Sequence, residues 1–217
     1  MNADDGPDAF LLLNCAAGGD AQAWGTLLAR HQERLRCVAS FRLDPSLRGR
    51  VDAADVVQEA FAAATARRAE FFAQSEQPLF LWLRWMVGNA LLELYRHHLG
   101  ARMRDARREV PPGCSLDMGG DDTRAALVAH LTAGATGPAT AAGRAEVKAR
   151  LEEAMGRMDP ADREVVALRH YEQLTSAEAA RVLGIQERAA AKRYLRALER
   201  LREILSDRPG GLTGLRP

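Results

Sequence analysis

Apolar residues recur at helical spacing in successive segments of this chain. The first such segment covers residues 10–17 and ends at a Gly-Gly pair, after which Asp20 can cap the start of a second helix. His31 falls on the polar side of this second helix, where a solvated or hydrogen-bonded histidine is expected rather than a ligand. The apolar positions of the second helix are Trp24, Leu27, Leu28, Leu35 and Val38.

Two further helices, separated by a loop, are predicted before residue 100. Residues 52–65 form a strong helical pattern with valine and alanine on the buried faces. A polar loop over residues 70–78 contains Phe71 and Phe72, which must pack back or bind something. The next helix covers residues 79–99 and has an apolar core stripe. The polar groups expected on its other side are Arg84, Asn89, Arg96, His97 and His98.

One face of the helix at 52–65 carries Asp55, Gln58 and Glu59 at spacings of three and four residues. Two carboxylates one turn apart could act as an acid–base pair or hold a metal ion. No histidine at matching spacing joins them, and no motif supplies an open coordination position. The stripe is therefore interpreted as a protein-docking or solvated surface, and we expect no metal, no cofactor and no catalytic role.

A basic segment runs from Arg84 to Arg108. It contains six arginines but only two acidic residues, Glu93 and Asp105, and it has a tryptophan near its start. Basic side chains beside exposed aromatic rings suit single-stranded nucleic acid. The reason is that the cations bind phosphates and the rings stack on unpaired bases.

The composition then changes at residues 109–143, which are rich in Gly, Pro, Ala and Thr. We expect a flexible linker there, with a short helix around residues 123–131. Residues 144–206 predict four helices; the first covers 144–158, and the second starts at Asp159-Pro160, an N-cap followed by proline at the first helical position. The expected fold is therefore all-α, with two small helical domains at 10–108 and 144–206. Residues 1–9 and 207–217 are expected to be disordered.

The last two helices, over residues 174–205, predict a helix-turn-helix. Thr175 and Glu178 form a Thr-x-x-Glu capping box for a helix that stops at Gly184, and a second helix opens at Gln186 and Glu187. Seven basic and two acidic residues lie between positions 181 and 202, whereas the whole chain carries a net charge of +1. Positive charge is thus concentrated on the second of these helices.

Arg188, Lys192 and Arg196 recur every four residues and therefore share one helix face. A solvated surface helix shows the same pattern. The capped preceding helix and the glycine turn favour DNA recognition, in which early residues reach base edges and later basic residues hold phosphates. The residues expected to pack inward are Tyr194, Leu198, Leu201 and Leu205.

The whole 217-residue chain has the composition of an ordinary soluble globular protein, with 47% hydrophobic and 27% charged residues. Cys15, Cys37 and Cys114 are far apart and lack C-x-x-C spacing, so reduced thiols and no structural zinc are expected. No apolar run is long enough to span a bilayer, and the acidic start of the chain is unsuited to a signal peptide. We expect a cytoplasmic protein without membrane insertion.

The order and spacing of these motifs resemble the sigma factors of bacterial RNA polymerase, and most closely the extracytoplasmic function (ECF) group. Residues 55–61, DVVQEAF, are similar to the family's D-x-V-Q-E-x-F signature, and residues 80–89 to its F-x-x-W-L…N pattern. Residues 174–185 resemble its promoter-binding helix-turn-helix. Residues 95–100 and 189–194 further resemble sigma factors of planctomycete-type bacteria.

The resemblance implies a protein that is not an enzyme and that directs core polymerase to promoters and assists their melting. Its partners would be promoter DNA and the polymerase, through the clamp helices of the largest subunit and the flap. Many relatives are held by an anti-sigma factor, and nothing in the sequence identifies one. The implied polymerase-binding residues are Asp55, Gln58 and Glu59. Those implied for the opened −10 element are Phe72, Arg84, Asn89 and Arg96. Those implied for the −35 element are Thr175, Gln186, Glu187, Arg188, Ala191, Lys192, Arg193 and Arg196.

The chain departs from the family at Ala190-Ala191, where many relatives have a Val-Lys pair on the recognition helix. A base contact from that lysine is lost or moved to Arg188 or Lys192, so the promoter sequence cannot be copied from relatives. Two alternatives stay open on the sequence. One is a helix-turn-helix regulator that acts without polymerase, and the less supported one is an enzyme using Asp55, Glu59 and a histidine at 97 or 98.

Overall fold

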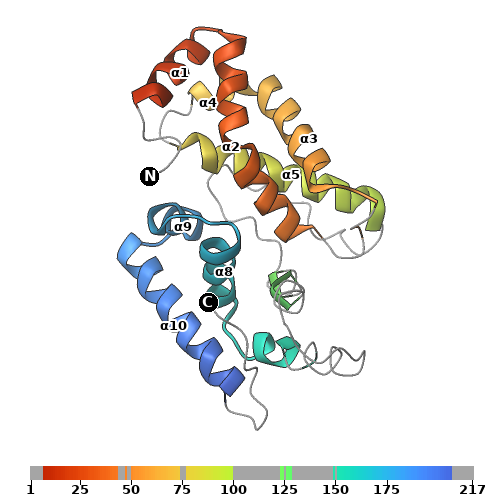
Figure 1. The fold of residues 1–217 in the computed structure, drawn as a ribbon, viewed down its shortest axis with the longest axis vertical. Helices are drawn as coiled ribbons and strands as arrows, with labels where there is room; N and C mark the ends of the chain where they lie inside the picture. Colours follow the sequence, from red (N-terminus) through yellow and green to blue (C-terminus); the bar gives the residue numbers. More distant parts are fainter. Residues whose placement is uncertain are drawn as a thin grey trace. The chain divides into compact units, whose positions relative to one another are not determined.

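The computed structural model describes residues 7–43, 47, 50–73, 77–99, 123–124, 126–128, 149 and 151–206, and the elements in these ranges are helices (Figure 1). The all-α fold class is thereby confirmed. The chain divides into two compact units. The first comprises Met1–Leu43 with Arg48–Leu116, and the second comprises Asp117–Pro217 with Asp44–Leu47. Among the described helices, none is long and apolar enough to cross a membrane.

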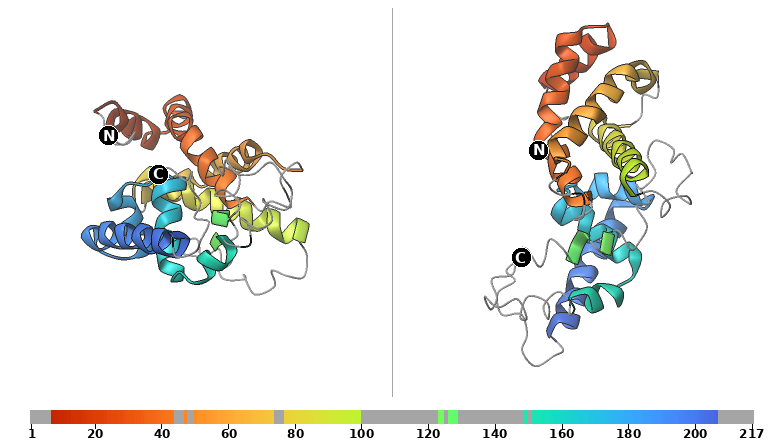
Figure 2. Two further views of the ribbon diagram at one scale, coloured as in Figure 1. Left: turned by 60° about the horizontal axis from the view of Figure 1, so that its bottom comes forward. Right: turned by 90° about the vertical axis from the view of Figure 1, so that its right-hand side faces the viewer.

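The first unit consists of α1 (Pro7–Ala17), α2 (Ala21–Arg42), α3 (Ala53–Ala66), α4 (Arg68–Ala73) and α5 (Leu79–Leu99). Helices α1 and α2 lie side by side as an antiparallel pair (Figure 2), and α5 packs on both α2 and α3. Asp20 caps α2 as predicted, because its carboxylate accepts hydrogen bonds from the backbone N–H groups of Gln22 and Ala23 at 2.8 and 3.1 Å.

Aromatic side chains join α2, α4 and α5 in the core of this unit. The Trp24 ring lies 6.3 Å from Phe71, 6.0 Å from Phe72 and 6.3 Å from Trp82, measured between centroids. The indole N–H of Trp24 donates a hydrogen bond to the Thr65 hydroxyl at 3.1 Å, which ties α2 to α3. The loop predicted at 70–78 is therefore wrong in its first part: residues 68–73 are helical, and both phenylalanines pack back.

His31 does not lie on the polar side of α2 as predicted. The side chain is 1% exposed, and its ring lies 5.8 Å from that of Phe80 on α5. The Tyr95 hydroxyl donates to the backbone carbonyl of Arg42 at 2.5 Å, so α5 also holds the end of α2. Helix periodicity gave the apolar positions of α2, but the width of the buried face depends on the neighbouring helix.

The second unit contains a helical segment at 151–156 followed by α8 (Pro160–Val166), the π-helical turn η2 (Ala167–Tyr171), α9 (Ser176–Leu183) and α10 (Glu187–Ser206). The predicted cap of α8 is confirmed, because Asp159 accepts from the N–H of Ala161 at 2.8 Å and proline follows it. The guanidinium of Arg163, which is 6% exposed, donates to the carbonyls of Met155 and Met158, each at 2.7 Å. That arginine therefore fixes α8 to the end of the preceding helix.

Part of the predicted linker packs into the second unit. Residues 123–124 and 126–128 are helical, and Leu127 is 1% exposed. The Thr123 hydroxyl donates to a carboxylate oxygen of Glu164 on α8 at 2.8 Å. These contacts belong to the short helix that the sequence suggested around residues 123–131, while the rest of the predicted linker lies outside the described residues.

Candidate nucleic-acid interface

The pair α9 and α10 has the local geometry of a helix-turn-helix. The capping box is present: the Thr175 N–H donates to a Glu178 carboxylate oxygen at 2.7 Å, and the Glu178 N–H donates to the Thr175 hydroxyl at 3.2 Å. Gly184 ends α9 with φ of 63° in the left-handed region, which glycine adopts without steric cost. The Ile185 N–H donates to the carbonyl of Ala180 at 3.0 Å and closes the turn. The predicted bounds of α9 are confirmed.

Small side chains let α9 and α10 approach each other closely. Ala179 and Ala180 of α9 are 0% and 4% exposed, and Ala190 and Ala197 of α10 are both 0% exposed. Ala190 is therefore a core residue. Within the Ala190-Ala191 departure from the family, the alanine at position 190 has a packing role. Larger residues at these positions would push α10 away from its support, because protein cores are close-packed.

The turn η2 connects α8 to the helix-turn-helix and was not predicted. The Arg169 guanidinium donates to the carbonyl of Leu174 and lies 5.5 Å from the centre of the Tyr194 ring on α10. Gln173 has a positive φ of 58° where the chain turns toward α9. Burial raises the pKa of Tyr171 to about 12, so this hydroxyl stays protonated at neutral pH. Through Arg169 the turn thus contacts α10 at Tyr194, on the side opposite the exposed basic residues.

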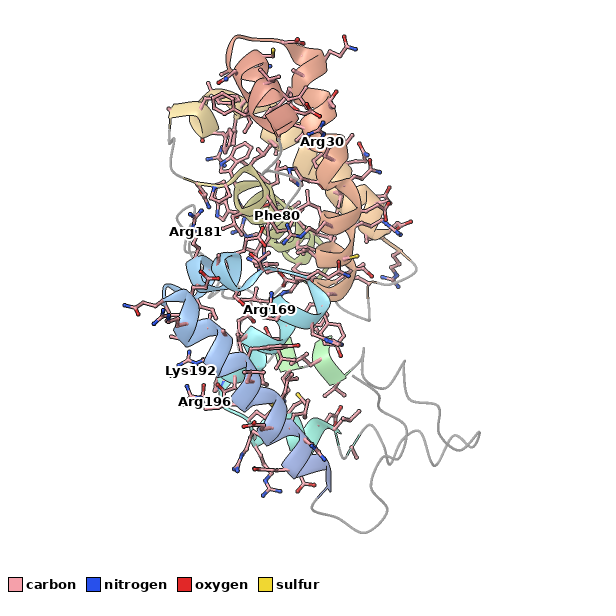
Figure 3. All side chains as sticks on the ribbon, turned by 60° about the vertical axis from the view of Figure 1, so that its left-hand side comes forward. Arg30, Phe80, Arg169, Arg181, Lys192 and Arg196 are labelled. Carbon is pink, nitrogen blue, oxygen red and sulfur yellow. The ribbon has the colours of Figure 1, made fainter. Side chains whose placement is uncertain are left out.

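The outer side of α10 carries the predicted basic stripe. Arg188, Lys192 and Arg196 are all exposed, and Figure 3 shows Lys192 and Arg196 on the side of α10 that faces away from α8. Gln186 and Glu187, at the start of the helix, are exposed as well. Arg181 adds an exposed cation on α9. This arrangement presents donors for phosphates along the helix and polar groups for base edges at its N-terminal end.

Three of the residues predicted for the −35 element do not lie on this outer stripe. Thr175 is engaged on both its N–H and its hydroxyl by Glu178, so it positions α9. Arg193 is half-buried, and its Nε lies 3.8 Å from a carboxylate oxygen of Asp162 on α8. Ala191 is half-buried at the edge of the exposed face. Helix periodicity separates positions 192 and 193 by about 100°, which explains why the neighbours differ.

The residues predicted for the −10 element are not gathered on one surface. Phe72 is half-buried on α4 and makes an edge contact with Trp24. Arg84 is 2% exposed, so its expected place on the polar side of α5 is wrong. Asn89 and Arg96 lie seven residues apart and therefore share a face of α5. Arg96 is exposed and pairs with Glu93 at 2.8 Å.

The acidic stripe on α3 is exposed along its length. Asp55, Gln58 and Glu59 point outward, while Val56 and Val57 on the other side are 2% and 1% exposed. Asp55 has a second role, because its carboxylate accepts from the Asp52 N–H at 3.4 Å in the capping box of α3. Within the described residues, no group of three His, Cys, Asp or Glu side chains could hold a metal ion, and the side chains of residues 97 and 98 lie outside them.

The prediction from the sequence missed one residue of the outer face of α10. Leu195 is 59% exposed among basic neighbours, although leucine is usually placed in the core. The helical register that gave the basic stripe also places position 195 at its edge, close to Arg188, since it lies seven residues after that residue.

A capped helix-turn-helix with a basic outer helix, in a chain that also has a second helical unit, defines a DNA-binding protein of transcription. Residues 148–201 match the family described as Sigma-70, region 4. Over 206 residues the chain is 32% identical to RNA polymerase sigma factor CnrH of Cupriavidus metallidurans, covering 94% of this chain and 97% of CnrH. Over 196 residues it is 32% identical to RNA polymerase sigma factor NccH of Alcaligenes xylosoxydans xylosoxydans, covering 88% and 90%.

A solved structure of CnrH in complex with the cytosolic domain of CnrY is 26% identical in sequence. It covers 92% of this chain and 97% of that chain, with a TM-score of 0.49. The sequence relatives show the family: the chain belongs to the RNA polymerase sigma factors of the ECF type. Such a protein directs core polymerase to promoters and assists their opening in transcription initiation.

Proposed function

We propose that the two units of this sigma factor divide the promoter between them. The second unit binds the −35 element as duplex through the outer face of α10. The first unit binds the polymerase core and the opened −10 strand. The observation that carries the proposal is the exposed stripe of Arg188, Lys192 and Arg196 on a helix held firmly by its capped partner.

The stripe suits the major groove because the groove admits one α-helix and exposes base edges to it. Gln186, Glu187 and Arg188 lie at the N-terminal end of α10, where recognition helices contact bases. Lys192 and Arg196 lie one and two turns further on, at places suited to phosphates. Thr175 and Arg193 are not among the proposed DNA contacts, because Thr175 bonds to Glu178 and Arg193 lies close to Asp162, as described above.

The acidic stripe of α3 is the proposed docking site for the clamp helices of the largest polymerase subunit. Asp55, Gln58 and Glu59 are exposed together, and negative side chains complement a basic partner surface. A contact of the second unit with the polymerase flap is proposed from the family resemblance. We propose a cytoplasmic location, because the proposed partners, polymerase and chromosomal DNA, lie in the bacterial cytoplasm.

For the opened −10 strand we propose Asn89 and Arg96 on their shared face of α5, together with Phe72 on α4. Residues 74–76 of the loop predicted at 70–78 lie outside the described residues. Arg84 is left out of this set because it is buried.

Two finer assignments are proposed from sequence resemblance. Residues 95–100 and 189–194 support a planctomycete-type subgroup. An anti-sigma partner is proposed because the relative CnrH has been solved in complex with the cytosolic domain of CnrY. Affinity purification of the full chain from its own cells, with recovery of one stoichiometric protein other than polymerase, is the expected result for such a partner.

Transcription by holoenzyme reconstituted from purified core and the full chain tests the function. Transcript starts mapped over a genomic library should cluster downstream of a common pair of elements. Core alone is the control and should give no such clustering. If holoenzyme starts were as scattered as those of core alone, the proposal would be abandoned.

A further inference from the structure

The outer face of α10 is not uniformly polar. The described residues include three large hydrophobic side chains that are well exposed, namely Phe10, Leu11 and Leu195 at 65%, 62% and 59%. The first two lie on α1, and Leu195 is the one on the second unit. A single exposed leucine needs no explanation by itself, so the argument depends on what surrounds it.

Leu195 lies at the Arg188 edge of the proposed DNA-facing stripe. Arg188 is seven residues before it and Arg202 seven residues after it, and positions seven apart drift by only about 20° around a helix. Lys192 is three residues before it, on the same side of the helix, and all three basic residues are exposed. If Arg188 and Lys192 face the duplex, Leu195 faces it with them.

Ala191 extends the apolar surface by one turn. It precedes Leu195 by four residues, so the two side chains are neighbours on the helix, and Ala191 is half-buried where Leu195 is exposed. The outer face of α10 thus has a basic strip, Lys192–Arg196, and an apolar strip, Ala191–Leu195. The departure from the family at position 191 helps to create the apolar strip.

The width of the major groove is sufficient for the part of α10 from Glu187 to Leu195. Eight residues separate it from Glu187 at the start of α10, which is about 12 Å along the helix axis at about 1.5 Å per residue. That length is similar to the width of the major groove, about 12 Å. The apolar group that bases present in this groove is the C5-methyl group of thymine.

We infer that Leu195, supported by Ala191, contacts a thymine methyl group in the −35 duplex and thereby selects thymine at that position. The inference rests on the proposed function, because it requires α10 to lie in the major groove. It adds a specificity-determining residue that reads the DNA by apolar contact, beside the polar readers Gln186, Glu187 and Arg188. The contact involves no charge, so its strength should depend little on salt.

The test compares thymine with deoxyuridine, which lacks only the methyl group. Holoenzyme with the full chain is bound to a promoter that it uses, and each thymine of the −35 element is replaced by deoxyuridine in turn. Loss of one buried methyl contact should weaken wild-type binding about fourfold at one position. The Leu195→Ala holoenzyme should bind the thymine and deoxyuridine duplexes equally at that position.

Two controls make the result specific. Leu11→Ala removes an equally exposed leucine from α1 and should keep the full response to deoxyuridine. The second control places cytosine or 5-methylcytosine at the same position. The wild-type holoenzyme should bind the 5-methylcytosine duplex more tightly than the cytosine duplex, and the Leu195→Ala holoenzyme should bind the two equally. Circular dichroism melting checks that the variants are folded.

An equal loss for wild type and Leu195→Ala, or no loss at any thymine, would overturn the inference. Both results would leave the proposed function intact, because the holoenzyme would still select its promoter. The proposed function fails separately, when the wild-type holoenzyme shows no preference for a −35 sequence, and that outcome overturns this inference too.

Discussion

At the scale of single residues, two neighbours on α10 should behave differently in DNA binding. Lys192 is exposed on the outer stripe, whereas Arg193 is half-buried and lies 3.8 Å from Asp162. Each phosphate contact contributes about −0.9 to the slope of log affinity against log salt. Lys192→Ala should therefore make the slope of holoenzyme binding to promoter DNA less negative by about 0.9. Arg193→Ala should leave it nearly unchanged.

The measurement is a salt series of binding constants for wild type and both variants on one promoter. Lys192 and Arg196 are the residues of α10 proposed for phosphates, so together they should contribute about −1.8 to the slope. Equal slopes for the two alanine variants would contradict the orientation of α10 described above.

The burial of individual side chains was harder to predict from the sequence than the helices themselves. Local spacing gave the exposed stripe Arg188, Lys192 and Arg196, because one helix face is enough to define it. The burial of His31 and Arg84 depends on tertiary packing, so a single helix pattern could not give it. Ala190 stands where many relatives have valine, and the structure makes it a close-packing position between α9 and α10, which the sequence pattern did not predict.

At the scale of elements, two glycines with opposite roles provide a matched pair. Gly184 has φ of 63° at the end of α9, and a Cβ there would meet nothing within 4 Å, so the cost of alanine is conformational. Gly184→Ala should destabilise the second unit by about 1–2 kcal/mol. Gly25 is exposed within α2 with equally open space, and Gly25→Ala should stabilise the first unit by about 0.5–1 kcal/mol.

Urea unfolding followed by two signals can separate these effects. The tryptophans, Trp24, Trp82 and Trp85, all lie in the first unit, so their fluorescence follows that unit, while far-ultraviolet circular dichroism follows both. Gly25→Ala should shift the fluorescence transition to higher urea. Gly184→Ala should shift part of the dichroism transition to lower urea. A change of the same sign for both variants would disprove the assigned backbone roles.

Element boundaries were predictable where local signals fix them. Asp20, Asp159 and the Thr175–Glu178 pair each cap a helix through side-chain oxygens, and Gly184 ends one, so the sequence carried those boundaries. The short helix α4 and the π-helical turn η2 lack such signals. Phe71 packs against Trp24 across the fold, and a contact of that kind is invisible to local pattern.

At the scale of the whole molecule, polymerase binding and −35 binding should be separable by mutation. Gln58→Lys with Glu59→Lys reverses the acidic stripe of α3 while sparing Asp55, which also caps that helix. Like charges facing a basic partner cost several kcal/mol, so affinity for core polymerase should fall by about tenfold or more. The same two substitutions at exposed Gln32 and Glu33 of α2 are the matched control and should have a smaller effect.

Core affinity can be measured by competition with wild-type protein for a limiting amount of polymerase. The stripe variant should keep its helical dichroism signal, because the substituted side chains are exposed. If it competed as well as wild type, the docking surface would have to lie elsewhere on the first unit.

The central claim, that the outer face of α10 reads the −35 duplex for the holoenzyme, is tested most directly by exchanging that element. Run-off transcription is measured on a used promoter and on the same promoter with its −35 sequence scrambled. Both templates are transcribed with wild type and with the triple variant Arg188→Ala, Lys192→Ala, Arg196→Ala. Wild type should lose about tenfold or more on scrambling, since each mismatched base pair costs about 1–3 kcal/mol. The triple variant should transcribe both templates at the same low level. A triple variant that still distinguished the two templates as strongly as wild type would contradict the account.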